Sequence, residues 1–354
     1  MVRKNEKRNG YGKILDAWVP PEDAGEAIGC VATTFTFSPV FFEEECLGRF
    51  LKLETDPKED DPLYLVEREE KLAQVVCAAV LVDQHHCKGS RSLRWDLLPA
   101  RLPGGVLHAK VSLLRWSQLI RIIVASANLT EDGYRRNQEV FGVLDYKPGG
   151  AAPISCLMQI VDFLRQAGAH SHIGLGTPSP ELMRWNSFLE GVAEAARDWG
   201  VEDAGRRAKD VFVHAVLTGS ERPSAFERLS QVWPGSNPPI RAYVFSPFFD
   251  PPEAPNRPAE EIWGFLRKRG KAEVNFYVSG EEVSGENRVF LCAPESLRFA
   301  QPTGRPGVLT KFYRLDLETD RPFHAKGIWV EDDRWAMYMI GSSNFTSPGL
   351  GLNR

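Results

Sequence analysis

The chain has 354 residues, of which 43% are hydrophobic and 25% are charged, with a formal net charge of −4. These values exclude a disordered, collagen-like or coiled-coil chain and indicate a globular protein large enough for two lobes. The longest apolar run, residues 75–82, is too short to span a bilayer, and residues 1–18 lack the apolar segment of a secretory signal. Six scattered cysteines without paired spacing indicate reduced thiols, so we expect a cytoplasmic protein without a membrane partner.

The first elements in chain order predict an α/β unit. Residues 33–42 alternate between polar and apolar side chains and are rich in residues that favour β-strands. The apolar residues of 41–52 have helical spacing, and 75–83 form an apolar run typical of a buried strand. Residues 108–114 and 119–126 are expected to form two strands around a polar turn.

The middle of the chain has helical periodicity over 153–167 and 180–199, a possible strand within 205–220, and a Pro/Gly-rich linker at 233–239. The first pattern then returns, as strand, helix, strand and a final strand pair, over residues 241–249, 259–270, 272–280, 324–330 and 335–342. We therefore expect an N-terminal lobe over 1–150, a helical insert and linker over 151–239, and a C-terminal lobe over 240–354.

An internal repeat supports this division. Residues 108–130 read HAKVSLLRWSQLIRIIVASANLT, and residues 324–346 read HAKGIWVEDDRWAMYMIGSSNFT. A Lys, Ser and Asn at three matching offsets from a second histidine would arise by chance roughly once in 1,000 cases. The ungapped offset of 216 residues pairs His108 with His324, Lys110 with Lys326, Ser126 with Ser342, Asn128 with Asn344, Thr130 with Thr346, Gly133 with Gly349 and Asn137 with Asn353. Upstream, TFSPVFF at 36–42 is echoed by VFSPFFD at 244–250, so we interpret the chain as a duplicated unit.

The repeated residues suit a site for a tetrahedral anion. In a strand, residues i and i+2 share a face, so each His and its Lys point the same way. Two such sets facing each other would hold phosphate oxygens with ammonium and carboxamide donors. One imidazole could attack phosphorus, while the other protonates the leaving oxygen and later deprotonates water.

HAK with SAN, and HAK with SSN, resemble the two H-x-K…S-x-N motifs of the phospholipase D superfamily. The resemblance covers about 30–150 and 240–354. It implies a duplicated αβα sandwich with pseudo-two-fold symmetry and the active site between two lobes. It further implies a phosphohistidine intermediate with no metal or cofactor, His108 as nucleophile and His324 as general acid/base. The family usually has Asp five residues after the Lys, where this chain has Arg115 and Glu331; tyrosyl-DNA phosphodiesterases also lack that Asp.

Glu139 lies eleven residues after Asn128, an offset at which family members often place a Glu or Gln. We expect Glu139 to hydrogen-bond a catalytic imidazole and to fix its tautomer, with a solvated helix charge as the alternative. The matching position in the second unit would be 355, so we expect a chain truncated after Arg354.

Basic residues mixed with aromatics precede each motif. Residues 88–101 contain Arg94, Trp95 and Arg101, and the second unit has 267–271, Arg298, Arg305 and Lys311. Such residues suit a groove for single-stranded nucleic acid, or they are solvated loops anchored by their aromatics. Ser126 and Ser342 are expected either to touch substrate or to cap the following helices.

Two other histidine groups resemble fragments of metal sites, but neither has a matching second cluster, and we expect no metal. They are His85, His86 and Cys87, and His170 and His172.

These features favour a metal-independent phosphodiesterase acting on nucleic acid in repair or defence, beside a helicase or ATPase partner. The alternatives are a phospholipase D or phosphatidyl transferase, and a non-catalytic phospholipase D-like interaction subunit.

Overall fold

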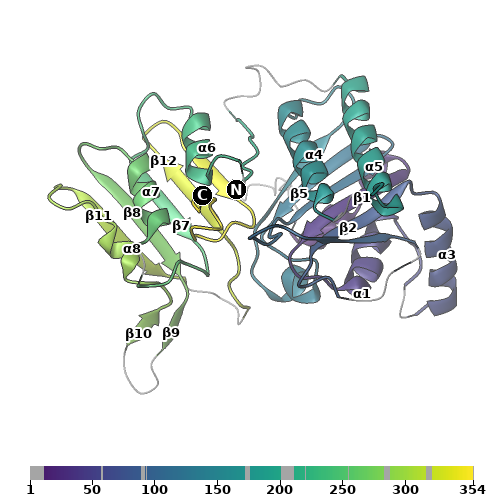
Figure 1. The fold of residues 1–354 in the computed structure, drawn as a ribbon, viewed down its shortest axis with the longest axis horizontal. Coiled ribbons are helices and arrows are strands. Elements are labelled where there is room, and N and C mark those ends of the chain that lie inside the picture. Colours follow the sequence, from purple (N-terminus) through teal and green to yellow (C-terminus); the bar gives the residue numbers. More distant parts are fainter. Residues whose placement is uncertain are drawn as a thin grey trace, which may run out of the picture.

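The computed structural model describes residues 12–56, 59–88, 92, 94–171, 176–200, 211–219, 221–253, 255–282, 288–315 and 321–353. The described chain forms two lobes that lie side by side, each built on one mixed sheet (Figure 1). The first sheet has the order β3-β2-β1-β4-β5-β6, and the second has the order β11-β8-β7-β12-β13. The strands of the first are β1 (Ala27–Thr34), β2 (Cys77–Asp83), β3 (Asp96–Ala100), β4 (Val111–Trp116), β5 (Leu119–Ala125) and β6 (Phe141–Tyr146). Those of the second are β7 (Arg241–Phe245), β8 (Ala272–Val278), β11 (Val308–Arg314), β12 (Gly327–Glu331) and β13 (Ala336–Ile340).

The two sheets share one topology, which confirms the duplication. In each, the first strand pairs in parallel with the second and antiparallel with the strand that follows the HAK motif. Each of those later strands continues into an antiparallel partner, β5 or β13. A hairpin of β9 (Gly280–Glu282) and β10 (Val289–Leu291) is an addition to the second lobe.

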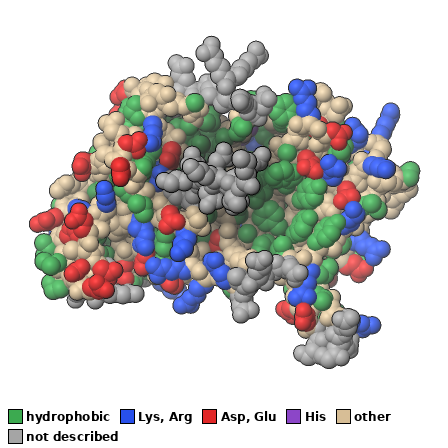
Figure 2. Space-filling view, turned by 180° about the vertical axis from the view of Figure 1, so that it is seen from behind, with side chains coloured by type: hydrophobic (Ala, Val, Ile, Leu, Met, Phe, Trp, Pro, Cys, Tyr) green, Lys and Arg blue, Asp and Glu red, His purple; other side chains and the backbone are tan. Residues whose placement is uncertain are grey.

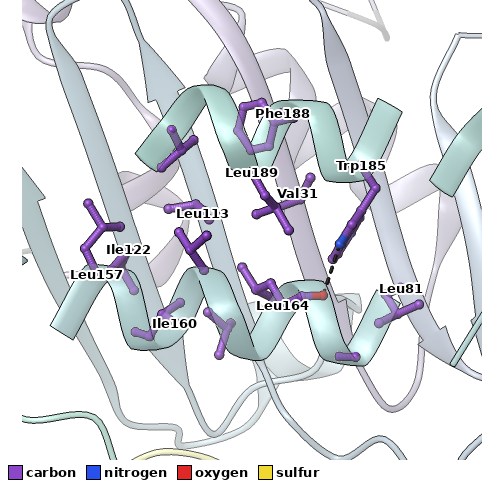
Figure 3. Packing of buried hydrophobic residues seen from close by; sticks show 14 of the residues in the cluster. Val31, Leu81, Leu113, Ile122, Leu157, Ile160, Leu164, Trp185, Phe188 and Leu189 are labelled. Atoms are coloured by element: carbon purple, nitrogen blue, oxygen red, sulfur yellow. Dashed lines mark hydrogen bonds between the residues drawn. The ribbon is translucent and has the colours of Figure 1, made fainter. Parts of the chain in front are cut away.

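Helices cover both faces of the first sheet. One face packs on α4 (Ile154–Ala169) and α5 (Pro180–Asp198), which confirms the two helical periodicities. Their apolar stripes meet β1, β2, β4 and β5, as Figure 3 shows for Leu157, Leu164, Trp185 and Leu189 on Val31, Leu81, Leu113 and Ile122. Most of the expected insert therefore completes the core of the first lobe, because this sheet face is too apolar to be left in water.

The other face of the first sheet packs on N-terminal segments. A continuous helical stretch of α1 (Pro39–Phe41), a π-helical turn (Phe42–Leu47) and α2 (Gly48–Phe50) lies there with a 3-10 helix (Ile14–Trp18), and α3 (Asp61–Ala73) adds Leu72 to the same core. The helical spacing of 41–52 is thus confirmed. A short turn (Glu22–Ala24) precedes β1, and a second π-helical turn (Asp132–Arg136) follows β5.

The second sheet has helices on one face. Its core side packs on α6 (Ala225–Val232), α7 (Arg257–Phe265) and α8 (Ser296–Phe299) through residues such as Val244, Phe276 and Ile328. The opposite face carries aromatic side chains from all five strands in two rows, Tyr243, Trp329 and Tyr338 in one register and Tyr277 and Tyr313 in the other. Within the described ranges no helix packs on this face, and from behind, hydrophobic side chains gather over the second lobe (Figure 2).

Two expectations about local structure are wrong. Residues 211–218, the described part of the segment 205–220, form no strand. The echo of TFSPVFF in VFSPFFD is out of structural register by four residues, because Leu129 N donates to Thr34 Oγ1 (3.0 Å) and its repeat partner Phe345 N donates to Ser246 Oγ (3.1 Å). Thr34 therefore corresponds to Ser246. None of the helices in the described part of the chain is long and apolar enough to cross a membrane.

Candidate active site

The first HAK segment runs in extended form immediately before β4. Thr33 on β1 fixes it from both sides: its hydroxyl donates to Ala109 O (3.0 Å) and accepts from Val111 N (3.1 Å). Buried Asp83, at the end of β2, accepts from Leu107 N (2.8 Å). Residues near the ends of β1 and β2 thus hold in place the segment that carries His108 and Lys110.

The two lysines occupy equivalent buried positions. Lys110 Nζ donates to His108 O (2.9 Å) and Lys326 Nζ donates to His324 O (2.5 Å), with both lysines at most 3% exposed. Burial lowers the pKa of Lys326 to about 7. Burial, and then the nearby charge of Lys326, lower the pKa of Lys110 well below its ordinary value. A bound phosphate would favour the charged form of both.

The two asparagines follow the strands β5 and β13 and differ in their partners. Asn128 Oδ1 accepts from Phe35 N and Thr36 N, both at 3.3 Å, which leaves its amide nitrogen as a donor. Asn344 Oδ1 is buried without a partner among the described residues. In the register that aligns Thr34 with Ser246, the residue at the position of Phe35 is Pro247, which has no N–H to donate.

A repeated turn holds each asparagine backbone. Gly133 N donates to Thr130 Oγ1 and Gly349 N donates to Thr346 Oγ1, both at 3.1 Å. A Cβ at Gly133 would lie 2.3 Å from the carbonyl oxygen of Asn128, and a Cβ at Gly349 would lie 2.5 Å from that of Asn344. Glycine is required at both positions because the turn closes directly on the backbone of the asparagine.

Glu139 reaches across to the other lobe. Its Oε1 lies 2.6 Å from His324 Nδ1. The backbones of the two segments also pair: Gln138 N donates to Pro322 O (2.8 Å), and His324 N donates to Gln138 O (3.0 Å). Arg321 adds donors to the carbonyls of Arg136 (3.0 Å) and Asn137 (2.5 Å). Burial acts to raise the pKa of Glu139, but hydrogen bonds from His324 and Ser126 hold it below its ordinary value.

His108 faces the second lobe in turn. It hydrogen-bonds the backbone of Ser342, and burial, with the charges of Lys110, Lys326 and His324, lowers its pKa to about 3. The imidazole is therefore neutral at ordinary pH. The electrostatic influence of Lys326 and His324 on this ring indicates that both sets face one site.

An aromatic ring accompanies each histidine. The Phe35 ring lies 5.3 Å from that of His108, and the Phe248 ring lies 5.9 Å from that of His324. His86 in turn contacts Phe35 at 4.3 Å. Phe35 lies just before the segment 36–42 and Phe248 lies within 244–250, and in the structural register that aligns Thr34 with Ser246 the two do not match, so the repeat did not point to them.

Several expected substrate-binding residues lie elsewhere. Trp95 is 3% exposed and its Nε1 donates to Glu43 Oε1 (2.7 Å), so its ring is a core anchor and not an open stacking platform. Arg94 pairs with Glu69, while Arg101 is exposed on the loop after β3. Ser126 is fully buried, with its hydroxyl on Glu139, whereas Ser342 is partly exposed beside His108.

The second basic group is largely engaged within the protein. Lys311 pairs with Glu273 (2.8 Å), and Arg305 donates to the Arg267 carbonyl. Among the residues that the structure describes, no group of three or more His, Cys, Asp or Glu could hold a metal ion. His172 lies outside those residues.

Comparisons with known proteins identify the fold. No protein-family model matches the sequence, and a search of curated proteins also finds no match. The yeast tyrosyl-DNA phosphodiesterase structure superposes with a TM-score of 0.51 at 11% identity, over 95% of this chain and 81% of that chain. A mutant of the same yeast enzyme gives a TM-score of 0.51 at 11% identity, over 95% of this chain and 80% of the other. The duplicated sheets and the overlap with this phospholipase D superfamily member show that the chain has a phospholipase D-like fold.

Proposed function

We propose that the chain is a metal-independent phosphodiesterase that cleaves nucleic acid through a phosphohistidine intermediate. The observation that carries the proposal is the bond between Glu139 of one lobe and His324 of the other, with two buried lysines nearby. This arrangement supplies an oriented acid/base and two cations, and the described residues contain no cluster of metal ligands.

His108 is the better nucleophile. Its low pKa leaves the ring unprotonated, and its bond to the Ser342 backbone engages one ring nitrogen and leaves a lone pair on the other. In the first step this nitrogen forms a bond to phosphorus, the bond from phosphorus to the leaving oxygen breaks, and protonated His324 gives that oxygen its proton.

In the second step water attacks phosphorus and passes a proton to His324, and the bond from phosphorus to His108 breaks. The Glu139 carboxylate stabilises the positive charge that the His324 ring carries before the first step and regains in the second. Lys110, Lys326 and the amide of Asn128 would hold the non-bridging oxygens. Asn344 completes the set in the second lobe.

Nucleic acid is the favoured substrate because the overlapping yeast structure is named for tyrosyl-DNA. We further propose that the protein acts in DNA repair or defence in the cytoplasm, together with a helicase or ATPase partner.

The test uses end-labelled single- and double-stranded DNA with excess EDTA, beside a phosphatidylcholine release assay. We expect DNA cleavage that survives EDTA. Activity that disappears with EDTA and returns with magnesium would contradict the metal-independent mechanism. Release of choline without DNA cleavage would contradict the proposal that nucleic acid is the substrate.

A further inference from the structure

A buried serine stands behind the Glu139–His324 pair. Ser126 is 0% exposed; its hydroxyl donates to Glu139 Oε2 and accepts from Val140 N (2.9 Å). The other carboxylate oxygen, Oε1, faces His324 Nδ1 and also accepts from Asn137 Nδ2 (3.3 Å). Each oxygen of Glu139 thus has its own donor.

We infer that Ser126 is a positioning residue that acts on His324 through Glu139, forming a chain of hydrogen bonds that runs from one lobe to the other. The inference rests on the proposed function in taking His324 as the acid/base. It gives Ser126 a role that does not require contact with substrate.

The physical reason is the buried setting of the carboxylate. Burial favours a protonated, neutral Glu139, which would have a proton on one oxygen and a weakened hold on the imidazole. That proton would bind Oε2, because Oε1 faces His324. The Ser126 hydroxyl already donates a hydrogen bond to Oε2 and so disfavours its protonation. The donated bond also fixes the plane of the carboxylate, so that Oε1 stays in line with Nδ1.

Other charged groups near Glu139 come from both lobes. Lys326 and His324 precede β12, Lys110 precedes β4, and Tyr134 lies in the turn after β5. The lysines favour the ionised carboxylate but make no hydrogen bond to it that fixes its orientation. Ser126 is the donor that couples carboxylate geometry to the strand pair β5–β6.

The test compares Ser126→Ala, Ser126→Cys and Ser126→Thr. The Cys variant keeps the volume but donates weakly, and the Thr variant restores the hydroxyl. The matched control is Ser347→Ala, which removes a similar buried bond, from Ser347 Oγ to Asp250 Oδ2 (2.6 Å), that includes neither Glu139 nor a histidine. The readouts are kcat and KM against pH, the melting temperature, and a carbon-13 NMR titration of the Glu139 carboxyl.

With Ser126→Ala and Ser126→Cys we expect the pKa of Glu139 to rise by at least ~0.5, because a donor to the ionised form is lost. We also expect kcat to fall at least ~10-fold with KM little changed, and its acid limb to move to higher pH. Ser126→Thr should recover most of both. Ser347→Ala should lower the melting temperature and leave the carboxyl titration and kcat alone.

An unchanged Glu139 titration in both Ser126 variants would overturn the inference, and so would a loss of kcat that Ser347→Ala reproduces. The NMR titration needs no substrate. If the unaltered chain cleaves no phosphodiester, the proposed function fails, while the titration still decides whether Ser126 controls Glu139.

Discussion

The two lobes carry the same motif residues on the same strand order, yet they surround them differently. The first lobe holds Asn128 by two backbone donors, sends Glu139 to the partner histidine, and is covered by helices on both sheet faces. The second lobe leaves Asn344 Oδ1 without a donor among the described residues and contacts His108 through the backbone of Ser342. Duplication therefore preserved the His, Lys and Asn residues, while their surroundings differ between the lobes, and we expect the two histidines to have different roles for that reason.

The largest expected effect separates the two histidines. His108→Ala should lower turnover by at least ~10³-fold and form no covalent species, because it removes the attacking nitrogen. His324→Ala should slow release of the intermediate more than its formation when the leaving group is a nitrophenol, which needs little protonation. Mass spectrometry of quenched reactions should then find a phospho-adduct on His108. An adduct on His324 would reverse the assignment, and both variants should keep the parent melting temperature.

The sheet faces give the next contrast. Ile122 on β5 and Tyr338 on β13 occupy matching positions, but Ile122 is 2% exposed under α4 and α5, while Tyr338 is 46% exposed. Ile122→Ala should lower the free energy of unfolding by ~2–5 kcal/mol, and Tyr338→Ala by less than ~1 kcal/mol. Urea denaturation measures both. Equal losses would mean that the aromatic face is packed as tightly as its counterpart.

The buried lysine should make stability depend on pH. Lys326 has a pKa of about 7 in the folded chain and 10.5 as its ordinary value, so the unfolded chain binds more protons between these limits. Stability therefore rises with pH across this window, and the cost of burying Lys326 is fully present below about pH 7. We expect Lys326→Met to raise the melting temperature at pH 6.5, by an amount that shrinks toward pH 10, and to abolish turnover. A constant gain at all pH values would contradict the low pKa.

The smallest effect concerns the asparagines. Pro247→Ala offers Asn344 Oδ1 the backbone donor that Phe35 gives Asn128, and should stabilise the chain by ~1 kcal/mol, less the entropy that proline removes from the unfolded state. Phe35→Pro is the reciprocal change and should destabilise by more, since it removes a donor and a ring. Thermal melts of the two variants compare the lobes directly. A loss of stability in Pro247→Ala would show that Asn344 gains nothing from that donor.

The sequence by itself determined the duplicated α/β fold and its pairs of His, Lys and Asn, because chance rarely repeats so many polar residues at a single offset of 216. The helices at 153–167 and 180–199 were also predictable from apolar periodicity, although their place on the first sheet was not. Which histidine Glu139 serves was decided only in three dimensions. The isolated β-bridge between Gln138 and Phe323 joins segments 185 residues apart, and no local pattern encodes such a contact. For the same reason only packing distinguished buried Trp95 and Ser126 from open ligand contacts: burial depends on what the rest of the chain places over a side chain.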